Sequence, residues 1–386
     1  QAVYTWAAPI MDAIEGGFTA LGEWVGANMA PGILNDLLVN GVIAGLGSVL
    51  VFLPQITILF AFILLLEDSG YLPRAAFLLD NLMAKSGLSG RSFIPLLSSF
   101  ACAVPAVMSA RTINDPRERL VTIAVAPLLT CSARLPVYAL IIAAVIPNRT
   151  VGGIFNLQGL TLFILYLAGI LSAALAAYIM KRLARMKGNV QQFPLLMELP
   201  TFRTPNFKHI MTSLWDRVKA FLKRAGTIIF ALAVVLWGLV SWPQPPAGAT
   251  GAAIDYSLAG MLGHAIQPLF APLGFTWEMC IAMIPGIAAR EVVVAALGTV
   301  YAVSASSEDA VQNALIPIVH NNWGLPTAFA FLAWYVYAPM CAATLAVIKR
   351  ETKSTKNMVM ITGYLFLMAY FAAFVVYQIS SRILSS

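Results

Sequence analysis

Apolar residues run along this chain in stretches of about 20, the length at which a helix crosses the hydrocarbon core of a bilayer. Residues 72–89 mix apolar and charged positions and predict a helix at the membrane surface. The pattern predicts an all-α polytopic membrane protein. We expect about six full spans, at residues 41–66, 120–146, 159–180, 225–242, 325–348 and 358–380.

Two further apolar stretches contain prolines that interrupt a helix. Residues 93–110 include Pro105 and are flanked at both ends by basic residues, which predicts that both ends are cytoplasmic. Residues 278–300 include Pro285 and lie between stretches without Lys or Arg. Both therefore predict re-entrant or broken helices, entered from opposite sides of the membrane.

Basic residues concentrate on the cytoplasmic side of bacterial membrane proteins. Residues 181–224 are rich in Lys and Arg and contain prolines, and they predict the largest cytoplasmic loop. Residues 243–276 and 302–323 contain neither Lys nor Arg, so we expect them to be external loops. Residues 1–38 also lack basic residues and alternate apolar with acidic positions.

The two halves of the chain show the same order of elements: a span, an interfacial helix, a proline-broken stretch and two spans. Residues 126–133 (APLLTCSA) and 338–343 (APMCAA) share Ala-Pro followed by Cys. The charge rule gives the halves opposite orientations, and inverted repeats with broken helices place transporter binding sites near the midplane. The expected domains are residues 1–38, an amphipathic external segment; 39–180, the first repeat; 181–224, the cytoplasmic basic loop; and 225–386, the second repeat with the C-terminal span.

Composition agrees with a lipid environment, because 60% of the residues are hydrophobic and 11% are charged, against about 25% charged in soluble domains. The net charge of +7 comes from short clusters beside apolar runs, so we expect no nucleic-acid partner. No GxxxxGK[ST] motif occurs, so the chain has no recognisable P-loop. The four cysteines form no CxxC pair, which argues against a disulfide framework.

Three cysteines lie beside prolines that break apolar helices. Cys102 precedes Pro105, Cys131 follows Pro127, and Cys341 follows Pro339 closely. A broken helix in hydrocarbon exposes backbone groups that protein, water or an ion must satisfy. Thiolates favour transition metals over magnesium and calcium. The alternative that these cysteines only fill the apolar core stays open.

Charged residues within apolar stretches are functional candidates. Glu291 could accept a cation, or the pair Arg290-Glu291 could gate the path or form a purely structural ion pair. Arg134 would repel a cation, so we expect it to pair with Glu67 or Asp68. The candidate site residues are Cys102, Cys131, Cys341 and Glu291 as metal ligands, and Glu67, Asp68, Arg134 and Arg290 as gating or structural ion pairs.

Several strings, in order along the chain, resemble the membrane domain of the bacterial ferrous iron transport protein B (FeoB) family. They are residues 66–71 (LEDSGY), 92–96 (SFIPL), 102–106 (CAVPA), 131–138 (CSARLPVY), 197–200 (MELP), 221–226 (FLKRAG) and 290–293 (REVV).

The resemblance implies a multi-pass permease of the bacterial inner membrane that carries Fe²⁺ through two inverted gate-type repeats with Pro-broken re-entrant helices. It also implies an N-terminal GTP-binding domain that binds GTP and Mg²⁺, and small cytoplasmic partner proteins; a homo-oligomer stays open. Since the chain starts at Gln1 and lacks a P-loop, we expect it to be the permease part alone, with no enzyme activity or cofactor of its own.

Two positions depart from the family pattern. The family typically has Gly-Cys-Asn-Val-Pro where residues 101–105 read ACAVP, and it often has Lys where this chain has Arg290. The departures leave another divalent metal open as the cargo. The residues are also compatible with a carrier of an organic solute such as a nucleoside, with a thiol-dependent membrane enzyme, and with a scaffold or sensor without transport.

Overall fold

The computed structural model describes residues 2–51, 53–85, 88–151, 155–185, 202–243, 256–290, 292–301 and 308–385. These residues are mostly helical. Their strands are confined to a short antiparallel pair, β1 (Thr150–Val151) and β2 (Phe155–Asn156). The predicted all-α fold is confirmed.

The chain divides into two compact units. Gln1–Ala126 and Ala174–Gly238 form the first, and Pro127–Ala173 and Leu239–Ser386 form the second. This division reports packing and does not test the repeats, whose boundaries stay predictions. Two helices continue from one unit into the other: α10 (Leu157–Arg185) and α12 (Thr227–Ser241).

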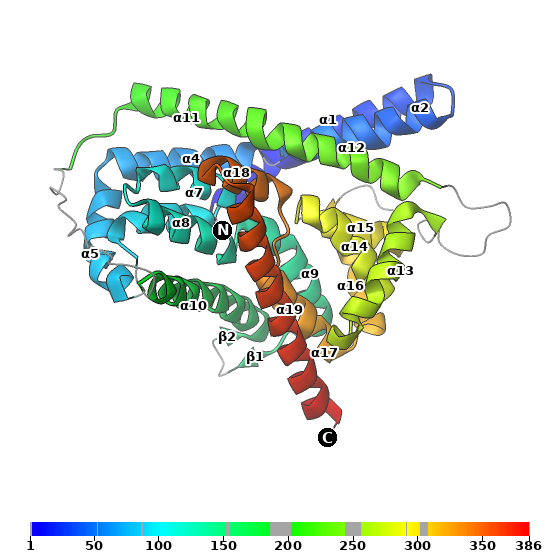
Figure 1. Cartoon of the computed structure of the whole chain (residues 1–386). Helices are drawn as coiled ribbons and strands as arrows, with labels where there is room; N and C mark the ends of the chain where they lie inside the picture. Colours follow the sequence, from blue (N-terminus) through cyan, green and yellow to red (C-terminus); the bar gives the residue numbers. More distant parts are fainter. Residues whose placement is uncertain are drawn as a thin grey trace. The chain divides into compact units, whose positions relative to one another are not determined.

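The first unit contains the blue, cyan and part of the green elements of Figure 1. Its other elements are α1 (Ala2–Asn28), α2 (Ile33–Asp36), the π-helical η1 (Leu37–Ile43), α3 (Ala44–Val51), α4 (Leu53–Asp68), α5 (Tyr71–Lys85), η2 (Gly90–Ser92), α6 (Phe93–Ser99), α7 (Ala103–Ser109), η3 (Ala110–Thr112), α8 (Pro116–Val125), α11 (Phe207–Phe221) and the π-helical η6 (Leu222–Gly226).

Local sequence fixes where several of these helices begin. The Asp115 side chain accepts a hydrogen bond from the Arg117 N–H at 2.8 Å, and Pro116 fills the first turn of α8. The Asn206 side chain accepts from the Lys208 N–H at 3.2 Å at the start of α11. Both are N-caps that satisfy amide groups left free by the first helical turn.

Helix α11 corrects the expected cytoplasmic loop at residues 181–224. It packs along α4 and continues through η6 into α12, as Figure 1 shows. Ile210, Val218 and Phe221 are its buried positions, and this amphipathic spacing stabilises a helix even between basic clusters. Residues 186–201 of the predicted loop lie outside the described residues.

The second unit contains the remaining elements. They are η4 (Ala126–Leu128), η5 (Ser132–Arg134), α9 (Leu135–Val145), α13 (Leu258–Phe270), η8 (Ala271–Leu273), α14 (Trp277–Ala288), α15 (Val292–Val300), α16 (Glu308–Asn322), α17 (Leu325–Tyr337), α18 (Ala342–Thr352) and α19 (Thr355–Ser385). Ala126 itself still belongs to the first unit.

Helices α13 and α16 correct the two expected external loops, residues 243–276 and 302–323, wherever these are described. The absence of Lys and Arg reports the side of the membrane and does not exclude a helix. The segment Leu258–Leu273 and helix α14 together form an apolar pair bent by 108°. The second unit therefore holds more helix than the charge pattern predicted.

In the described part of the chain, five helical segments are long and apolar enough to cross a membrane, or six if the bent pair forms one span. This confirms a multi-pass membrane protein. The expected span at residues 225–242 is helical as α12 but is not among the five. The five are Ile33–Asp68, Pro116–Val145, Leu157–Leu183, Leu325–Thr352 and Thr355–Ile383.

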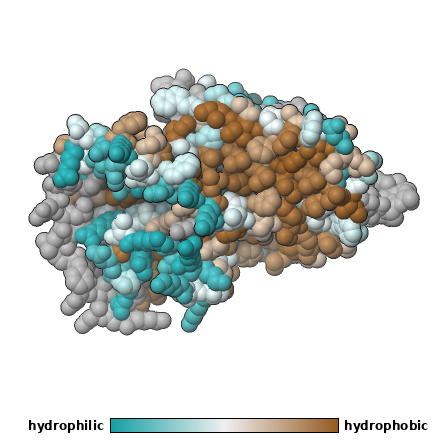
Figure 2. Space-filling model, turned by 90° about the horizontal axis from the view of Figure 1, so that it is seen from above, coloured by the Kyte–Doolittle hydropathy of each residue, from teal (hydrophilic) through white to brown (hydrophobic). Residues whose placement is uncertain are grey.

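Hydrophobic side chains cover a broad, continuous area of one face of the molecule (Figure 2). Large apolar side chains are also exposed on α19, where Leu367 and Phe371 are 68% and 70% exposed. A soluble monomer rarely exposes so large an apolar patch. Such side chains are stable when acyl chains replace water around them.

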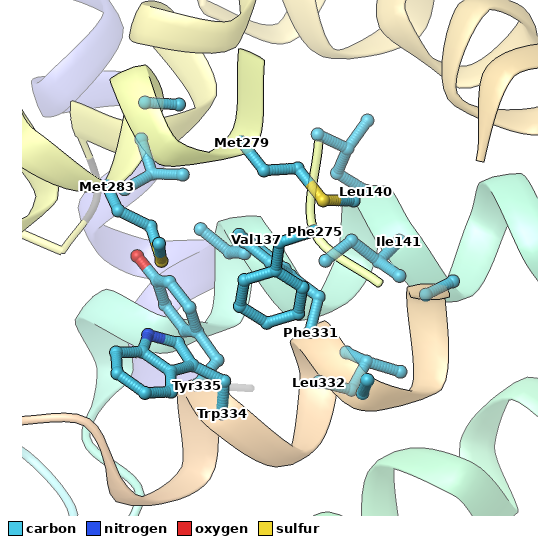
Figure 3. Packing of buried hydrophobic residues seen from close by; sticks show 14 of the residues in the cluster. Val137, Leu140, Ile141, Phe275, Met279, Met283, Phe331, Leu332, Trp334 and Tyr335 are labelled. Carbon is cyan, nitrogen blue, oxygen red and sulfur yellow. The ribbon is translucent and has the colours of Figure 1, made fainter. Parts of the chain in front are cut away.

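Aromatic rings fill the core of the second unit. The Phe270 ring meets Trp334 edge-on with centroids 5.1 Å apart, and Phe275 meets Phe331 at 5.5 Å. Figure 3 shows Phe275 and Phe331 side by side in this cluster. Helix α17 packs along α19, so the core holds α17, α14 and α9 in fixed positions around the helix breaks described next.

The geometry of the turn between η8 and α14 predicts that one added methyl group destabilises the fold strongly. Gly274 has φ +73°, and a Cβ there would lie 2.0 Å from Cε2 of Tyr377. We expect Gly274→Ala to destabilise this chain by about 1–3 kcal/mol or more, measured as thermal unfolding in detergent. Gly363→Ala is the control, because a Cβ at Gly363 meets nothing within 4 Å. Equal effects of the two changes would contradict this packing.

Candidate functional site at the helix breaks

Four apolar segments unwind between two half-helices. The breaks lie at residues 100–102, between α6 and α7; at 129–131, between η4 and η5; at 289–290, after α14; and at 338–341, between α17 and α18. Broken helices were predicted at the first and third positions. The second and fourth lie within segments predicted as continuous spans.

The three candidate cysteines share one structural position. Cys102, Cys131 and Cys341 are each the N-cap residue of the helix that follows a break, with extended backbone. Each cysteine therefore begins a helical turn, and none of the three side chains forms a cap hydrogen bond. Of these three breaks, the sequence predicted the one at Cys102, and it did not predict the shared position.

Arg290 joins three of the breaks within the second unit. Its side chain is 4% exposed. Its Nε donates to the carbonyl of Met340 at 2.7 Å, one terminal nitrogen donates to the carbonyl of Ala338 at 3.4 Å, and the other contacts Cys131 Sγ at 3.4 Å. The Tyr335 hydroxyl donates to the carbonyl of Arg290 itself. One guanidinium thus satisfies carbonyls that the break in α17–α18 leaves free.

Arg134 is fully buried and serves the break in its own segment. Its terminal nitrogens donate to the carbonyls of Pro127 at 3.0 Å and Leu129 at 3.2 Å, with a longer contact to Leu128 at 3.4 Å. These carbonyls lie within seven residues of Arg134, and leaving them unpaired in hydrocarbon is costly. The expected pairing of Arg134 with Glu67 or Asp68 is therefore corrected.

Glu67 and Asp68 end α4 in the first unit and have other partners. Glu67 forms an ion pair with Arg217 of α11 at 3.0 Å. The Asp68 carboxylate accepts from the Asn206 N–H at 2.6 Å, just before α11 begins. In the structure, both carboxylates therefore fasten α11 to the end of α4.

Cys131 Sγ contacts the Arg290 guanidinium, and Cys341 directly follows Met340, whose carbonyl accepts from Arg290 Nε. The Thr344 hydroxyl donates to Cys341 Sγ at 3.1 Å. Cys102 lies in the first unit, and Glu291 lies outside the described residues. Across the part of the chain that is described, no three His, Cys, Asp or Glu side chains gather in a way that could hold a metal ion.

Some buried polar atoms near the breaks of the second unit do not make all the hydrogen bonds that they could make. The hydroxyls of Thr130 and Tyr138 lie near each other and have no further partner among the described residues, nor does Nε of Arg134. Figure 3 shows Met283 directed toward the hydroxyl end of Tyr335. Buried polar atoms of this kind are usually completed by water or a ligand.

The sequence reasoning missed the backbone carbonyls of Ala338 and Met340 and the hydroxyl of Tyr335. Pro339 was the available signal, because a proline within an apolar run removes one amide donor and frees carbonyls. The residues that donate hydrogen bonds to those carbonyls are far from them in the sequence, so residue spacing could not identify them.

Two family models match the chain. One, described as "Nucleoside recognition", matches residues 49–145 and 222–355, more than half of the chain. The other, described as "Ferrous iron transport protein B C terminus", matches residues 162–217. No solved structure matches.

Curated relatives named Fe(2+) transporter FeoB are similar to nearly the whole chain. One from Leptospira interrogans serogroup Icterohaemorrhagiae serovar copenhageni is 42% identical over 98% of this chain and 56% of its own length. One from Leptospira biflexa serovar Patoc is 40% identical over 98% and 56%. One from Staphylococcus aureus strain COL is 38% identical over 98% and 55%. The chain therefore spans about half the length of the curated relatives it matches.

The hydrogen bonds of Arg134 generate a stability prediction. Arg134→Met leaves three carbonyls without a donor, so we expect a loss of about 3 kcal/mol or more, measured as thermal unfolding of this chain in detergent. Arg134→Lys should lose less, because the ammonium still donates. The matched control is Arg217→Met, which breaks a partly exposed ion pair worth about 1 kcal/mol or less. If both methionine variants unfold at the same temperature, the Arg134 contacts are not structural.

Proposed function

Because the chain belongs to the ferrous iron transport protein B family, we propose that it transports Fe²⁺ across the bacterial inner membrane as the permease part of a longer transporter. Fe²⁺ is its cargo, and the chain itself has no enzyme activity. The names of the relatives, the match to the C-terminal model and the polytopic helices support this proposal.

The observation that carries the proposal is the convergence of three helix breaks in the second unit. They present carbonyl oxygens of Ala338 and Met340 and the thiol of Cys131 in one place, with Cys341 nearby. A cation that leaves water needs oxygen or sulfur donors in place of its hydration shell. Sulfur donors favour a transition metal such as Fe²⁺ over magnesium and calcium.

Further parts of the transport system follow from the family. We propose that residues 39–180 and 225–386 are two inverted gate-type repeats, and that Cys102 and Glu291 also line the path. GTP and Mg²⁺ would bind a separate GTP-binding domain, which small cytoplasmic proteins would accompany. Glu67 and Asp68 would couple movements of α11 to α4 through the contacts to Arg217 and Asn206.

An organic solute such as a nucleoside fits the breaks less well, although one matching model is described by nucleoside recognition. Hydrogen-bonding to a base calls for convergent amide side chains. Residues 100–102, 129–131, 289–291 and 338–341 contain neither Asn nor Gln. Thiols and carbonyls at these positions suit a metal cation better.

The test is anaerobic Fe²⁺ uptake by proteoliposomes that contain the complete transporter with its GTP-binding domain. We expect Cys131→Ser and Cys341→Ser to lower the uptake rate about tenfold or more, a size typical of perturbed metal sites. Cys102→Ser and Glu291→Gln test the remaining proposed ligands in the same assay. Labelled nucleoside uptake, measured in parallel, should stay at background.

Cys280→Ser is the matched control, because Cys280 is buried within α14 and not at a break. It should transport at the wild-type rate. Uptake by every cysteine variant at the wild-type rate, with all variants folded, would show that the thiols only pack the core.

A further inference from the structure

Two buried guanidiniums with no carboxylate partner among the described residues lie at the breaks of the second unit. Arg134 and Arg290 are 0% and 4% exposed, and they repel each other electrostatically. The ion pair of Glu67 with Arg217 lies in the first unit. Burying a charge is costly unless it is paired and hydrogen-bonded, so the hydrogen bonds of each guanidinium decide its position.

The two arginines differ in what they bind. Arg134 donates to carbonyls within its own segment, five to seven residues before it. Arg290 donates to carbonyls 48 and 50 residues away and contacts a thiol 159 residues away. Arg134 therefore completes one broken helix, whereas Arg290 connects three separate breaks.

The atoms that receive the Arg290 donors are those a transition-metal cation would use. The carbonyl oxygens of Ala338 and Met340 and the sulfur of Cys131 are oxygen and sulfur donors around one positive charge. A doubly charged metal on the same atoms would lie within a few ångströms of the guanidinium, where two positive charges repel strongly in a medium of low dielectric constant. The guanidinium and a metal ion thus exclude each other.

The backbone at Arg290 is fixed by its neighbours, and only the Arg290 side chain reaches the oxygen and sulfur atoms of the other breaks. The Tyr335 hydroxyl binds the Arg290 carbonyl. A Cβ at Gly286 would lie 2.4 Å from Cγ2 of Val293 and 2.6 Å from Cε of Met340, so the side chains of α15 and of the 338–341 break pack closely against α14. Since the Arg290 side chain alone spans the distance to these donors, its rotation would free them.

We propose that Arg290 is a tethered cation that occupies the cation site formed by Cys131 Sγ and the carbonyls of Ala338 and Met340, and that metal enters only when its guanidinium leaves. The proposal rests on the proposed function for the identity of the cargo. It adds that residue 290 sets the affinity of the site for metal.

The experiment measures binding and transport separately. Purified complete transporter in detergent, under reducing anaerobic conditions, is titrated with Co²⁺, whose bond to a thiolate gives a charge-transfer absorbance. We expect Arg290→Gln to bind Co²⁺ at least tenfold more tightly than the wild type and to show the thiolate absorbance. Adding Cys131→Ser to Arg290→Gln should remove the absorbance, whereas adding Cys280→Ser should not.

Transport gives the second readout. Proteoliposomes with Arg290→Gln should leak Fe²⁺ without GTP at least tenfold faster than the wild type. Arg290→Lys keeps the charge but lacks the planar fork, so its affinity and leak should lie between the two. If Arg290→Gln does not fold, Arg290→Lys decides, and wild-type affinity and leak in that variant overturn the proposal.

The outcomes separate this proposal from the proposed function. A wild type that transports Fe²⁺, together with a folded Arg290→Gln that neither binds Co²⁺ more tightly nor leaks, overturns the tethered cation and leaves Fe²⁺ transport standing. A wild type that moves no Fe²⁺, together with an Arg290→Gln that gains the Cys131-dependent absorbance, overturns the cargo and supports the tethered cation.

Discussion

The second unit depends on one constraint: a helix that unwinds within hydrocarbon must find donors for the carbonyls it frees. An orphaned carbonyl in hydrocarbon is costly. Arg134 and Arg290 supply those donors, at the breaks that follow η4 and α17. The strong positive charge of each guanidinium is thereby held in a region that would otherwise exclude it.

This constraint links stability to function. Carbonyls that need a donor are also the oxygens that can bind a cation when the donor leaves. Cys131 at the same point adds a sulfur ligand, because its Sγ contacts the same guanidinium. A transporter can therefore build its binding site from the same unwound segments that its arginines stabilise.

The first unit shows a different use of charge. Glu67 and Asp68 lie at the end of α4 and hold α11 by an ion pair and a backbone hydrogen bond. These contacts are partly exposed, so each contributes little to stability. Their role is to position one helix against another, because they connect the apolar helix α4 to the amphipathic helix α11 in the basic region of the chain.

The sequence alone determined the class of the protein. Apolar stretches of bilayer length predicted five spans that the structure contains, and prolines within such stretches predicted broken helices at Cys102 and near Arg290. The motifs and their order identified the family, because each motif is a short continuous string that can be read from the sequence without the structure. The distribution of charged residues did not predict secondary structure, because helices α11, α13 and α16 lie in segments that it predicted as loops.

Only the tertiary structure decided the partners of the charged residues. Arg290 contacts Cys131 across 159 residues, and Arg134 takes carbonyls of its own segment in place of Glu67 or Asp68. Helical periodicity describes neighbours three or four residues apart and carries no information about such contacts. They arise when packing of α9, α14 and α17 brings separate breaks together, and the arginines then bind the carbonyls that lie within reach.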